Sequence, residues 1–337
     1  MSPVGKEIPL SLLERDAEWR ASVQESQLAA LELLRKEPLA PRLCPICSSE
    51  PFDAGSVLGV SYLQCAECHH LFCSFKPTPK FLDTYYKRVG SGQQLSYVNL
   101  DTSAKKARQE DVSNPKAEFI AKVIREEDSL NQRGLWVDIG SGIGDLLFAA
   151  KNLGFTAVGL EPDPTQADIA LSRGIKTHKL FFDSGSDFPP EPGQVKVVSL
   201  LNVLEHVPDP VPLLCNLSGR MPPGSYLAVE VPRHPSLSSM IQLAGFSPIN
   251  RHINPPEHLH LFSSVSLERA LESASLESVA TWIYGSDALE VFFAVGHALG
   301  WSSAFDSKNL VDAVNRLQAQ IDLGGLSDNM LVVARKR

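Results

Sequence analysis

Short apolar runs alternate with helical patterns from residue 135 to the end of the chain. Five of these runs cover residues 135–139, 156–160, 176–181, 195–201 and 226–231. Most are rich in Val, Leu and Ile, which is typical of strands buried on both faces of a sheet. Because strands that alternate with helices form parallel sheets covered by those helices, the pattern predicts an α/β fold with a doubly wound sheet.

The end of the chain predicts a helix over 266–275, a sixth strand over 276–284 and a last strand over 330–334. Two apolar helices, 288–300 and 309–323, lie between the last two strands. This insertion could be a substrate lid, a dimer surface or part of the core, and we favour packing in the core.

The N-terminal part has a different pattern. Apolar residues are scattered among charged ones from residue 10 to 37, which predicts a helix that Pro38 ends. Further helices are predicted over 80–89 and 115–128. The polar residues 90–114 between them predict a loop or a mobile flap.

The composition allows a large core and gives no sign of a nucleic-acid-binding surface. Hydrophobic residues make up 43% of the 337 residues, and the formal net charge is −8. An acidic chain without clustered Lys and Arg argues against nucleic acid as a partner. No stretch is long and apolar enough for a membrane span, and the start lacks the pattern of an export signal. We therefore expect a cytoplasmic protein whose six cysteines stay reduced.

Two cysteine pairs, Cys44 with Cys47 and Cys65 with Cys68, have the spacing C-x2-C-x17-C-x2-C. Each C-x2-C turn brings two sulfurs to one ion, and four thiolates complete a closed tetrahedron. Because a closed tetrahedron leaves no position for water, the spacing predicts a structural Zn²⁺ site in a ribbon over residues 41–75.

Three neighbours of these cysteines, Cys73, His69 and His70, could replace one of the four ligands. The sixth cysteine, Cys215, is interpreted as an ordinary buried thiol.

The patterns divide the chain into four predicted parts. These are an N-terminal helical segment (1–40), the zinc-binding ribbon (41–75), a helical linker or flap (76–132) and the α/β domain (133–337).

A glycine-rich turn follows the first predicted strand, with Asp138 before it and Gly140, Gly142 and Gly144 within it. Glycine lets the backbone approach a ligand where a Cβ would clash. The third glycine comes one residue too early for the dinucleotide fingerprint, and no basic residue follows in the turn to hold a pyrophosphate. Asp138 could favour the cationic end of a cofactor, and Glu161 at the tip of the second strand could accept both hydroxyls of a ribose. The combination disfavours NAD and favours S-adenosylmethionine.

These residues, with the run LEHVPDP at 204–210, resemble a class I S-adenosylmethionine-dependent methyltransferase over residues 133–336. The two cysteine pairs resemble the zinc-binding domain fused to bacterial sugar C-methyltransferases and to related surface-glycan methyltransferases. The resemblance implies a Rossmann-like sheet of seven strands whose last strand is antiparallel to the others.

The resemblance also implies a set of cofactor-binding residues. They are Asp138, Gly140, Gly142, Gly144, Glu161, Asp183, Asn202 and Val203. Glu161 would hold the ribose, while Asn202 and Val203 would contact the methionine part through backbone groups. Asp183 would lie near the adenine amino group, although Asp183-Ser-Gly also fits a plain turn.

Two histidines could remove the proton from a methyl acceptor. His206 follows the fourth strand and titrates in the useful range, but it could also be a helix-start residue bonded to the backbone. His258 lies in the run NPPEHLH, where Glu257 could help to orient its ring. In the sugar C-methyltransferases a Tyr-x-Glu-His motif carries the base, and here Pro255 stands at the tyrosine position. This departure favours methylation of a hydroxyl over methylation of a carbon.

The sequence therefore predicts an enzyme that methylates a hydroxyl of a small glycan, nucleotide sugar or related metabolite. His258 is the first candidate for the base and His206 the second. The alternatives are an RNA or protein methyltransferase that uses the zinc ribbon for recognition, and a non-catalytic scaffold that binds the cofactor. The expected assembly is a monomer or a homodimer.

Overall fold

The computed structural model describes most of the chain. The ranges are 42–78, 102–127, 134–183, 185–188, 194–245, 252–298 and 308–337, with the isolated positions Glu25, Leu28, Ala29, Leu31, Glu32, Leu34 and Phe81. The chain forms two compact units that are each assembled from separate stretches. Unit 1 takes in Met1–Asn99, Val231–Leu267 and Trp282–Met330, and unit 2 takes in Leu100–Glu230, Glu268–Thr281 and Leu331–Arg337.

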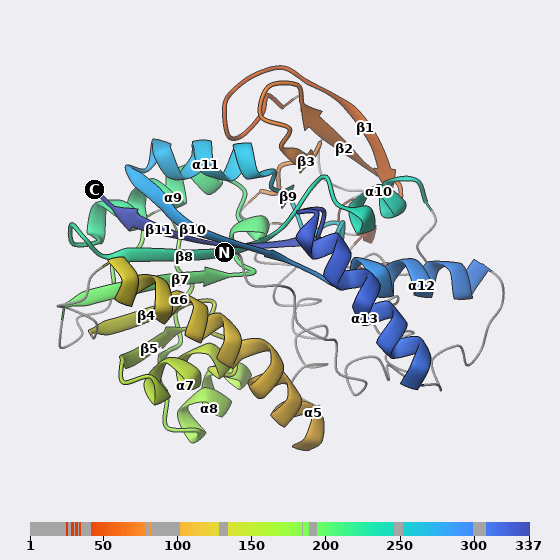
Figure 1. Cartoon of the computed structure of the whole chain (residues 1–337). Coiled ribbons are helices and arrows are strands. Elements are labelled where there is room, and N and C mark those ends of the chain that lie inside the picture. The colour runs from red at the N-terminus through yellow and green to blue at the C-terminus, as the bar shows by residue number, and fades with distance from the viewer. Residues whose placement is uncertain are drawn as a thin grey trace. The chain divides into compact units, whose positions relative to one another are not determined.

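A seven-stranded sheet forms the centre of the α/β fold. In chain order its strands are β4 (Leu135–Ile139), β5 (Thr156–Leu160), β6 (Lys176–His178), β7 (Val195–Leu201), β8 (Tyr226–Pro232), β10 (Leu276–Tyr284) and β11 (Asn329–Lys336). Their order in space is β6-β5-β4-β7-β8-β11-β10 (Figure 1). β4 pairs in parallel with both β5 and β7. The strand order reverses at β4, and ligands of such sheets bind beside this switch at the carboxyl ends of the strands.

The last strand, β11, runs against its neighbour β8. Near one end of the pair, Gly224 N donates to the Lys336 carbonyl and Lys336 N donates to the Ser225 carbonyl. Near the other end, Arg233 N donates to the Asp328 carbonyl. Rising residue numbers on one strand meet falling numbers on the other, so the pair is antiparallel. This confirms the prediction of seven strands with an antiparallel last strand.

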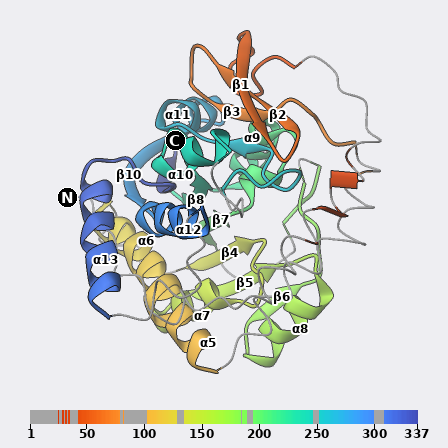
Figure 2. The same cartoon turned by 90° about the vertical axis from the view of Figure 1, so that its right-hand side faces the viewer.

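Helices connect and cover these strands. They are α5 (Thr102–Arg108), α6 (Asn114–Glu127), α7 (Asp145–Asn152), α8 (Pro164–Ser172), α9 (Pro210–Arg220) and α11 (Ser264–Ser273), with a π-helical segment η2 (Gln109–Ser113) and a 3-10 turn η3 (Leu204–His206). α7 packs against β4 and β5, and α8 packs against β6 (Figure 2). α8 begins where the Asp163 side chain accepts from the backbone N–H groups of Thr165 and Gln166, with Pro164 at the first helical position.

A second, four-stranded sheet lies in unit 1. It consists of β1 (Pro51–Val57), β2 (Val60–Cys65), β3 (Leu71–Cys73) and β9 (His260–Leu261), in this order. β3 pairs antiparallel with β9, with Leu71 opposite Leu261 and Phe72 opposite His260. The predicted ribbon therefore obtains one strand from a segment almost 190 residues further along the chain.

The remaining helices also belong to unit 1. They are α10 (Leu237–Leu243), α12 (Asp287–Ala298) and α13 (Lys308–Leu323). α12 and α13 pack together through the buried side chains of Ala288, Leu289, Val311 and Val314. This contact is between the two inserted helices, so the interpretation of the insertion as core packing against the sheet stays a prediction.

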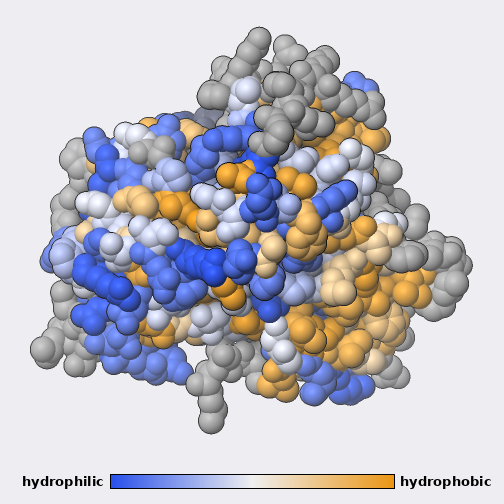
Figure 3. Space-filling model, turned by 90° about the horizontal axis from the view of Figure 1, so that it is seen from above, coloured by the Kyte–Doolittle hydropathy of each residue, from blue (hydrophilic) through white to orange (hydrophobic). Residues whose placement is uncertain are grey.

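Other hydrophobic side chains of these helices reach the surface. Met240 on α10 and Leu323 at the end of α13 are 60% and 63% exposed. On the face that Figure 3 shows, hydrophobic residues gather towards the right-hand side and hydrophilic residues dominate the left-hand side. No helix among the described residues is both long and apolar enough to cross a membrane.

The sequence predicted the bounds of β4, β5, β7 and β10 as the structure has them. The prediction of a loop over 90–114 is wrong for its described part, because residues 102–113 form α5 and η2. Most of the helix predicted over 80–89 and most of the one over 10–37 lie outside the described residues.

Candidate functional site

The glycine turn follows β4 directly. Gly140, Gly142 and Gly144 have φ values of 71°, 53° and 81°, which residues with a Cβ rarely adopt. A Cβ on Gly140 would lie 2.5 Å from Cγ2 of Val203. The turn therefore passes against a residue just beyond the end of β7, and only glycine leaves room for this approach.

Asp138, near the end of β4, is almost completely buried. The hydroxyl of Ser199 on β7 donates to its Oδ1 at 2.5 Å, and this hydroxyl in turn accepts from the indole N–H of Trp136 at 2.8 Å. Burial raises the pKa of Asp138 to about 7, although the bond from Ser199 opposes the rise. A nearby cation would favour the charged form of this carboxyl.

Glu161 follows β5 and holds the turn from the other side. Its Oε2 accepts from the backbone N–H of Gly142 and its Oε1 accepts from that of Asp163, both at 2.8 Å. Burial raises the pKa of this carboxyl, and the two backbone bonds oppose the rise. Each carboxylate oxygen has a further lone pair, so the group can also accept from two hydroxyls of a ligand.

Asp183 is exposed and shapes its own turn. Its Oδ1 accepts from Gly185 N at 2.8 Å and from the Ser186 hydroxyl at 2.9 Å. The Asn216 amide also donates to the Asp183 carbonyl, at 3.0 Å. These hydrogen bonds are those of a plain turn, which was the alternative role for Asp183. The contact of Asp183 with adenine stays a prediction.

The segment after β7 carries Asn202, Val203 and His206. Asn202 has a φ of 54°, and its Nδ2 donates to Oε1 of Glu230 at 3.2 Å. Glu205 is fully buried in η3, and the partly exposed His206 ring has its Nε2 3.8 Å from Glu205 Oε1. His206 N donates to the Val203 carbonyl, as expected for a residue at a helix start.

The described groups of unit 2 fit an adenosyl cofactor with a cationic end. The turn is a cradle that a Cβ at Gly140 would fill. Glu161 offers two acceptor oxygens for a ribose, and Asp138 offers a carboxylate for a cation. All three lie at the carboxyl ends of β4 and β5, on the edge of the sheet where ligands bind.

A comparison with protein families agrees with this geometry. A family model described as a methyltransferase domain matches residues 108–281, slightly more than half of the chain. The chain belongs to the methyltransferase family. It is an S-adenosylmethionine-dependent enzyme, and the turn after β4 is the place where the residues fit that cofactor.

Solved structures with a similar fold include several methyltransferases. Magnesium protoporphyrin IX methyltransferase from Synechocystis PCC 6803, with bound SAH, is 11% identical with a TM-score of 0.47, over 77% of this chain and 100% of that one. Coclaurine N-methyltransferase bound to N-methylheliamine and SAH is 12% identical with a TM-score of 0.41, over 65% and 72% of the two chains. Geranyl diphosphate methyltransferase with GPP and sinefungin is 16% identical with a TM-score of 0.43, over 66% and 77%. The family assignment does not rest on these low values.

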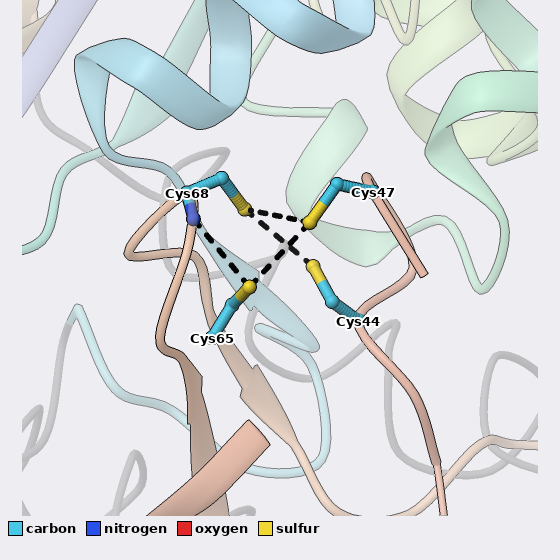
Figure 4. A group of neighbouring side chains, drawn as sticks. All are labelled: Cys44, Cys47, Cys65 and Cys68. Atoms are coloured by element: carbon cyan, nitrogen blue, oxygen red, sulfur yellow. Dashed lines mark hydrogen bonds between the residues drawn. The ribbon is translucent and has the colours of Figure 1, made fainter. Parts of the chain in front are cut away.

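The methyltransferase also carries a cluster of four cysteines in unit 1 (Figure 4). Cys44 Sγ lies 3.5 Å from Cys68 Sγ, and Cys47 Sγ lies 3.5 Å from Cys65 Sγ and 3.6 Å from Cys68 Sγ. A tetrahedral Zn²⁺ with Zn–S bonds of about 2.3 Å places its sulfurs about 3.8 Å apart, so these residues fit the ion with a small adjustment. Hydrogen bonding from Cys68 lowers the pKa of Cys44 to about 5.

The alternative ligands Cys73, His69 and His70 are not part of this cluster. Among the described residues, the cluster consists of the sulfurs of the four paired cysteines. Burial raises the pKa of Cys73 to about 11. His70 is fully buried, with Nε2 3.1 Å from His260 Nδ1 and Nδ1 3.2 Å from the Ser266 hydroxyl. The interpretation of Cys215 as a buried thiol is wrong, because this cysteine is exposed on α9.

His258 of the methyltransferase is oriented within unit 1 by a backbone carbonyl. Its Nδ1 lies 2.7 Å from the carbonyl oxygen of His252. A carbonyl only accepts, so Nδ1 carries the proton and Nε2 carries the lone pair of the neutral ring. Glu257, predicted to help orient this ring, accepts through Oε2 from the Asn254 amide at 2.8 Å.

Sequence reasoning missed two buried contacts between ionisable side chains. In unit 1, His252 Nε2 lies 2.8 Å from Asp328 Oδ2. In unit 2, Lys116 Nζ lies 2.8 Å and 2.7 Å from the two carboxylate oxygens of Glu230. The partners are 76 and 114 residues apart, so no local motif indicated them.

Proposed function

We propose that this methyltransferase methylates a hydroxyl of a small sugar-like metabolite, such as a glycan or a nucleotide sugar. His258 is proposed as the base and His206 as the second candidate. The observation that supports this most is the bond from His258 Nδ1 to the His252 carbonyl, because it leaves the lone pair of the neutral ring on Nε2. A carbon acceptor remains the less favoured form, since Pro255 replaces the tyrosine of the sugar C-methyltransferase motif.

In this proposal, residues of the chain hold the cofactor and move one proton. Asp138, Glu161 and the glycine turn hold the cofactor, with Asn202 and Val203 against its methionine part. When bound, S-adenosylmethionine supplies an electrophilic methyl group. His258 Nε2 would take the proton of the acceptor hydroxyl as that oxygen receives the methyl group, and would later release the proton to water. The four cysteines hold Zn²⁺ for stability and take no part in this step.

The acceptor class is tested with methyl-labelled S-adenosylmethionine. The purified enzyme is offered three fractions of a cell extract, namely desalted small molecules, bulk RNA and bulk protein. We expect label in the small-molecule fraction, bound as an ether that resists hydrolysis of esters. Label in RNA or protein would overturn the proposed substrate class and favour recognition through the zinc ribbon. No label in any fraction, with intact cofactor binding, would favour the non-catalytic scaffold.

The base is tested on the fraction that accepts label. His258→Gln should lower turnover by about 10²- to 10⁴-fold, the usual contribution of a positioned base. Its affinity for S-adenosylhomocysteine should stay within about twofold, because the variant changes no group assigned to the cofactor. The matched control is His69→Asn. His69 is exposed and lies outside the cysteine cluster, and asparagine also tolerates its left-handed backbone conformation. Full activity in His258→Gln, with a loss in His206→Gln, would transfer the role to His206.

A further inference from the structure

A buried ion pair lies at the carboxyl end of the sheet in unit 2. Lys116 comes from α6, and Glu230 lies near the end of β8. The Lys116 ammonium lies within 2.8 Å of both carboxylate oxygens, and the two residues are 9% and 3% exposed. The pair is therefore almost completely removed from water.

The Glu230 end of the pair is bonded to Asn202 in two ways. Asn202 Nδ2 donates to Glu230 Oε1 at 3.2 Å, and Asn202 N donates to the Glu230 carbonyl at 3.0 Å. Asn202 has a φ of 54°, a left-handed conformation that asparagine tolerates better than most residues with a Cβ, and the two bonds hold it against the end of β8. The next residue, Val203, is the one that approaches Gly140 in the cofactor turn.

Stability alone gives a poor reason for this pair. Removing two charges from water costs free energy that their attraction seldom exceeds, and well-packed apolar replacements of similar volume are often as stable or more stable. What an apolar pair could not supply is the acceptor oxygen that faces the Asn202 amide. The specific contribution of the pair is therefore the placement of Asn202.

We propose that Glu230 is a positioning residue for cofactor binding in this methyltransferase and that Lys116 compensates its buried charge. Lys116 holds the Glu230 carboxylate, and Glu230 holds Asn202 in its left-handed conformation. This keeps Val203 at the distance from Gly140 that shapes the cofactor cradle. The inference rests on the proposed assignment of Asn202 and Val203 to the cofactor pocket, and it does not depend on the acceptor or on His258.

Two double variants separate positioning from stability. Lys116→Met with Glu230→Gln removes both charges and keeps an oxygen that accepts from Asn202. Lys116→Met with Glu230→Leu removes both charges and that acceptor. Binding of S-adenosylhomocysteine is measured by calorimetry, and folding is measured by thermal unfolding. We expect the Gln variant to bind within about threefold of wild type and the Leu variant to bind about tenfold more weakly, although both should remain folded.

Equal affinity of the two double variants would overturn the inference, as would a loss of affinity that follows only the unfolding temperature. The control is Lys122→Met, which removes an exposed lysine of the same helix and should change nothing. Asn202→Ala tests the underlying assignment separately. If Asn202→Ala binds normally, the placement of Asn202 in the pocket is wrong; if it binds weakly while the two double variants bind alike, only the positioning role is wrong.

Discussion

Burial and a bound cofactor have opposite effects on the protonation of the Asp138 carboxyl group. Burial without a cation disfavours its charged form and raises its pKa to about 7. A bound cofactor with a cationic amino-acid end would favour that charged form. Folding of the cofactor-free protein therefore favours the protonated form of this carboxyl, and binding of the cofactor favours its charged form.

Asp138→Asn should weaken binding of S-adenosylmethionine about tenfold or more, because it removes a charge-assisted contact and keeps the shape. In the wild type, affinity should fall as pH decreases from 8 to 6, since Asp138 takes up a proton through a pKa of about 7. In the variant this pH dependence should be smaller. Calorimetric titrations at several pH values measure both effects.

The same substitution should stabilise the cofactor-free protein at alkaline pH. The folded pKa is above the unfolded value of 3.8, so the destabilisation grows as pH rises from about 4 to about 7 and is complete above that. At roughly 1.4 kcal/mol per pKa unit, relief at pH 8 is at most about 4 kcal/mol. Thermal unfolding should therefore show a larger gain at pH 8 than at pH 5. The exposed Asp168→Asn is the control, and an equal effect of both variants would contradict this account.

At the scale of elements, the strands were predicted well because their patterns are local. β4, β5 and β7 are buried parallel strands, and such strands are continuous apolar runs that end at turn residues. The glycine turn was predictable for the same reason, since a backbone with positive φ leaves glycines in the sequence at fixed positions.

The wrong loop over 90–114 has a specific cause. Pro115 lacks a backbone N–H and is typical of a helix start, so the helix was expected to begin there. In the structure the helical path continues from α5 through η2 into α6, and Asn114 N donates to the Gln109 carbonyl, five residues back. A π-helical turn of this kind interrupts the normal bond ladder and accommodates the proline.

Gly140→Ala should disrupt the link between the turn and the end of β7. Alanine in a left-handed conformation costs roughly 1–2 kcal/mol, and its Cβ would lie 2.5 Å from Val203 Cγ2. We expect a lower unfolding temperature and loss of measurable binding of S-adenosylhomocysteine.

The second substitution Val203→Ala should restore part of the stability of Gly140→Ala, because it removes the clash but not the backbone strain. Gly219→Ala is the matched control, since this helical glycine has no atom within 4 Å of an added Cβ. It should raise stability by about 0.5–1 kcal/mol and leave cofactor binding unchanged. Normal binding by Gly140→Ala would show that the turn does not form the cradle.

At the scale of the whole molecule, the sequence pointed to candidate site residues that are close together in the chain and gave no sign of contacts between distant residues. Asp138, the glycines and Glu161 lie in one strand–turn–helix–strand segment, and their spacing reveals them. Lys116 and Glu230 meet only because the fold brings α6 to the end of β8. Buried pairs of this kind leave no periodic pattern, so only coordinates identify them.

The same limitation applies to the predicted zinc ribbon, which is not an independent stretch of chain. Beyond the pairing of β3 with β9, the Ser263 hydroxyl donates to the Cys68 carbonyl at 2.6 Å, and its oxygen accepts from Ser266 N at the start of α11. The four cysteines are thus connected to a segment of unit 1 that lies 195 residues further along the chain. Loss of the ion should therefore destabilise that segment too.

Removal of zinc with a strong chelator should therefore unfold more than the ribbon. Structural Zn²⁺ contributes about 10–16 kcal/mol in small modules, and its loss would remove that free energy from this sheet. Hydrogen exchange should increase in β1–β3 and also in β9 and the first turn of α11, while β4 and β5 of unit 2 keep their protection. Cys47→Ser should reproduce this result and lower the zinc content, and Cys215→Ser, an exposed cysteine outside the cluster, should do neither. If exchange increased only in β1–β3, β9 would be stable without the ribbon, and the proposed dependence of the distant segment on zinc would be wrong.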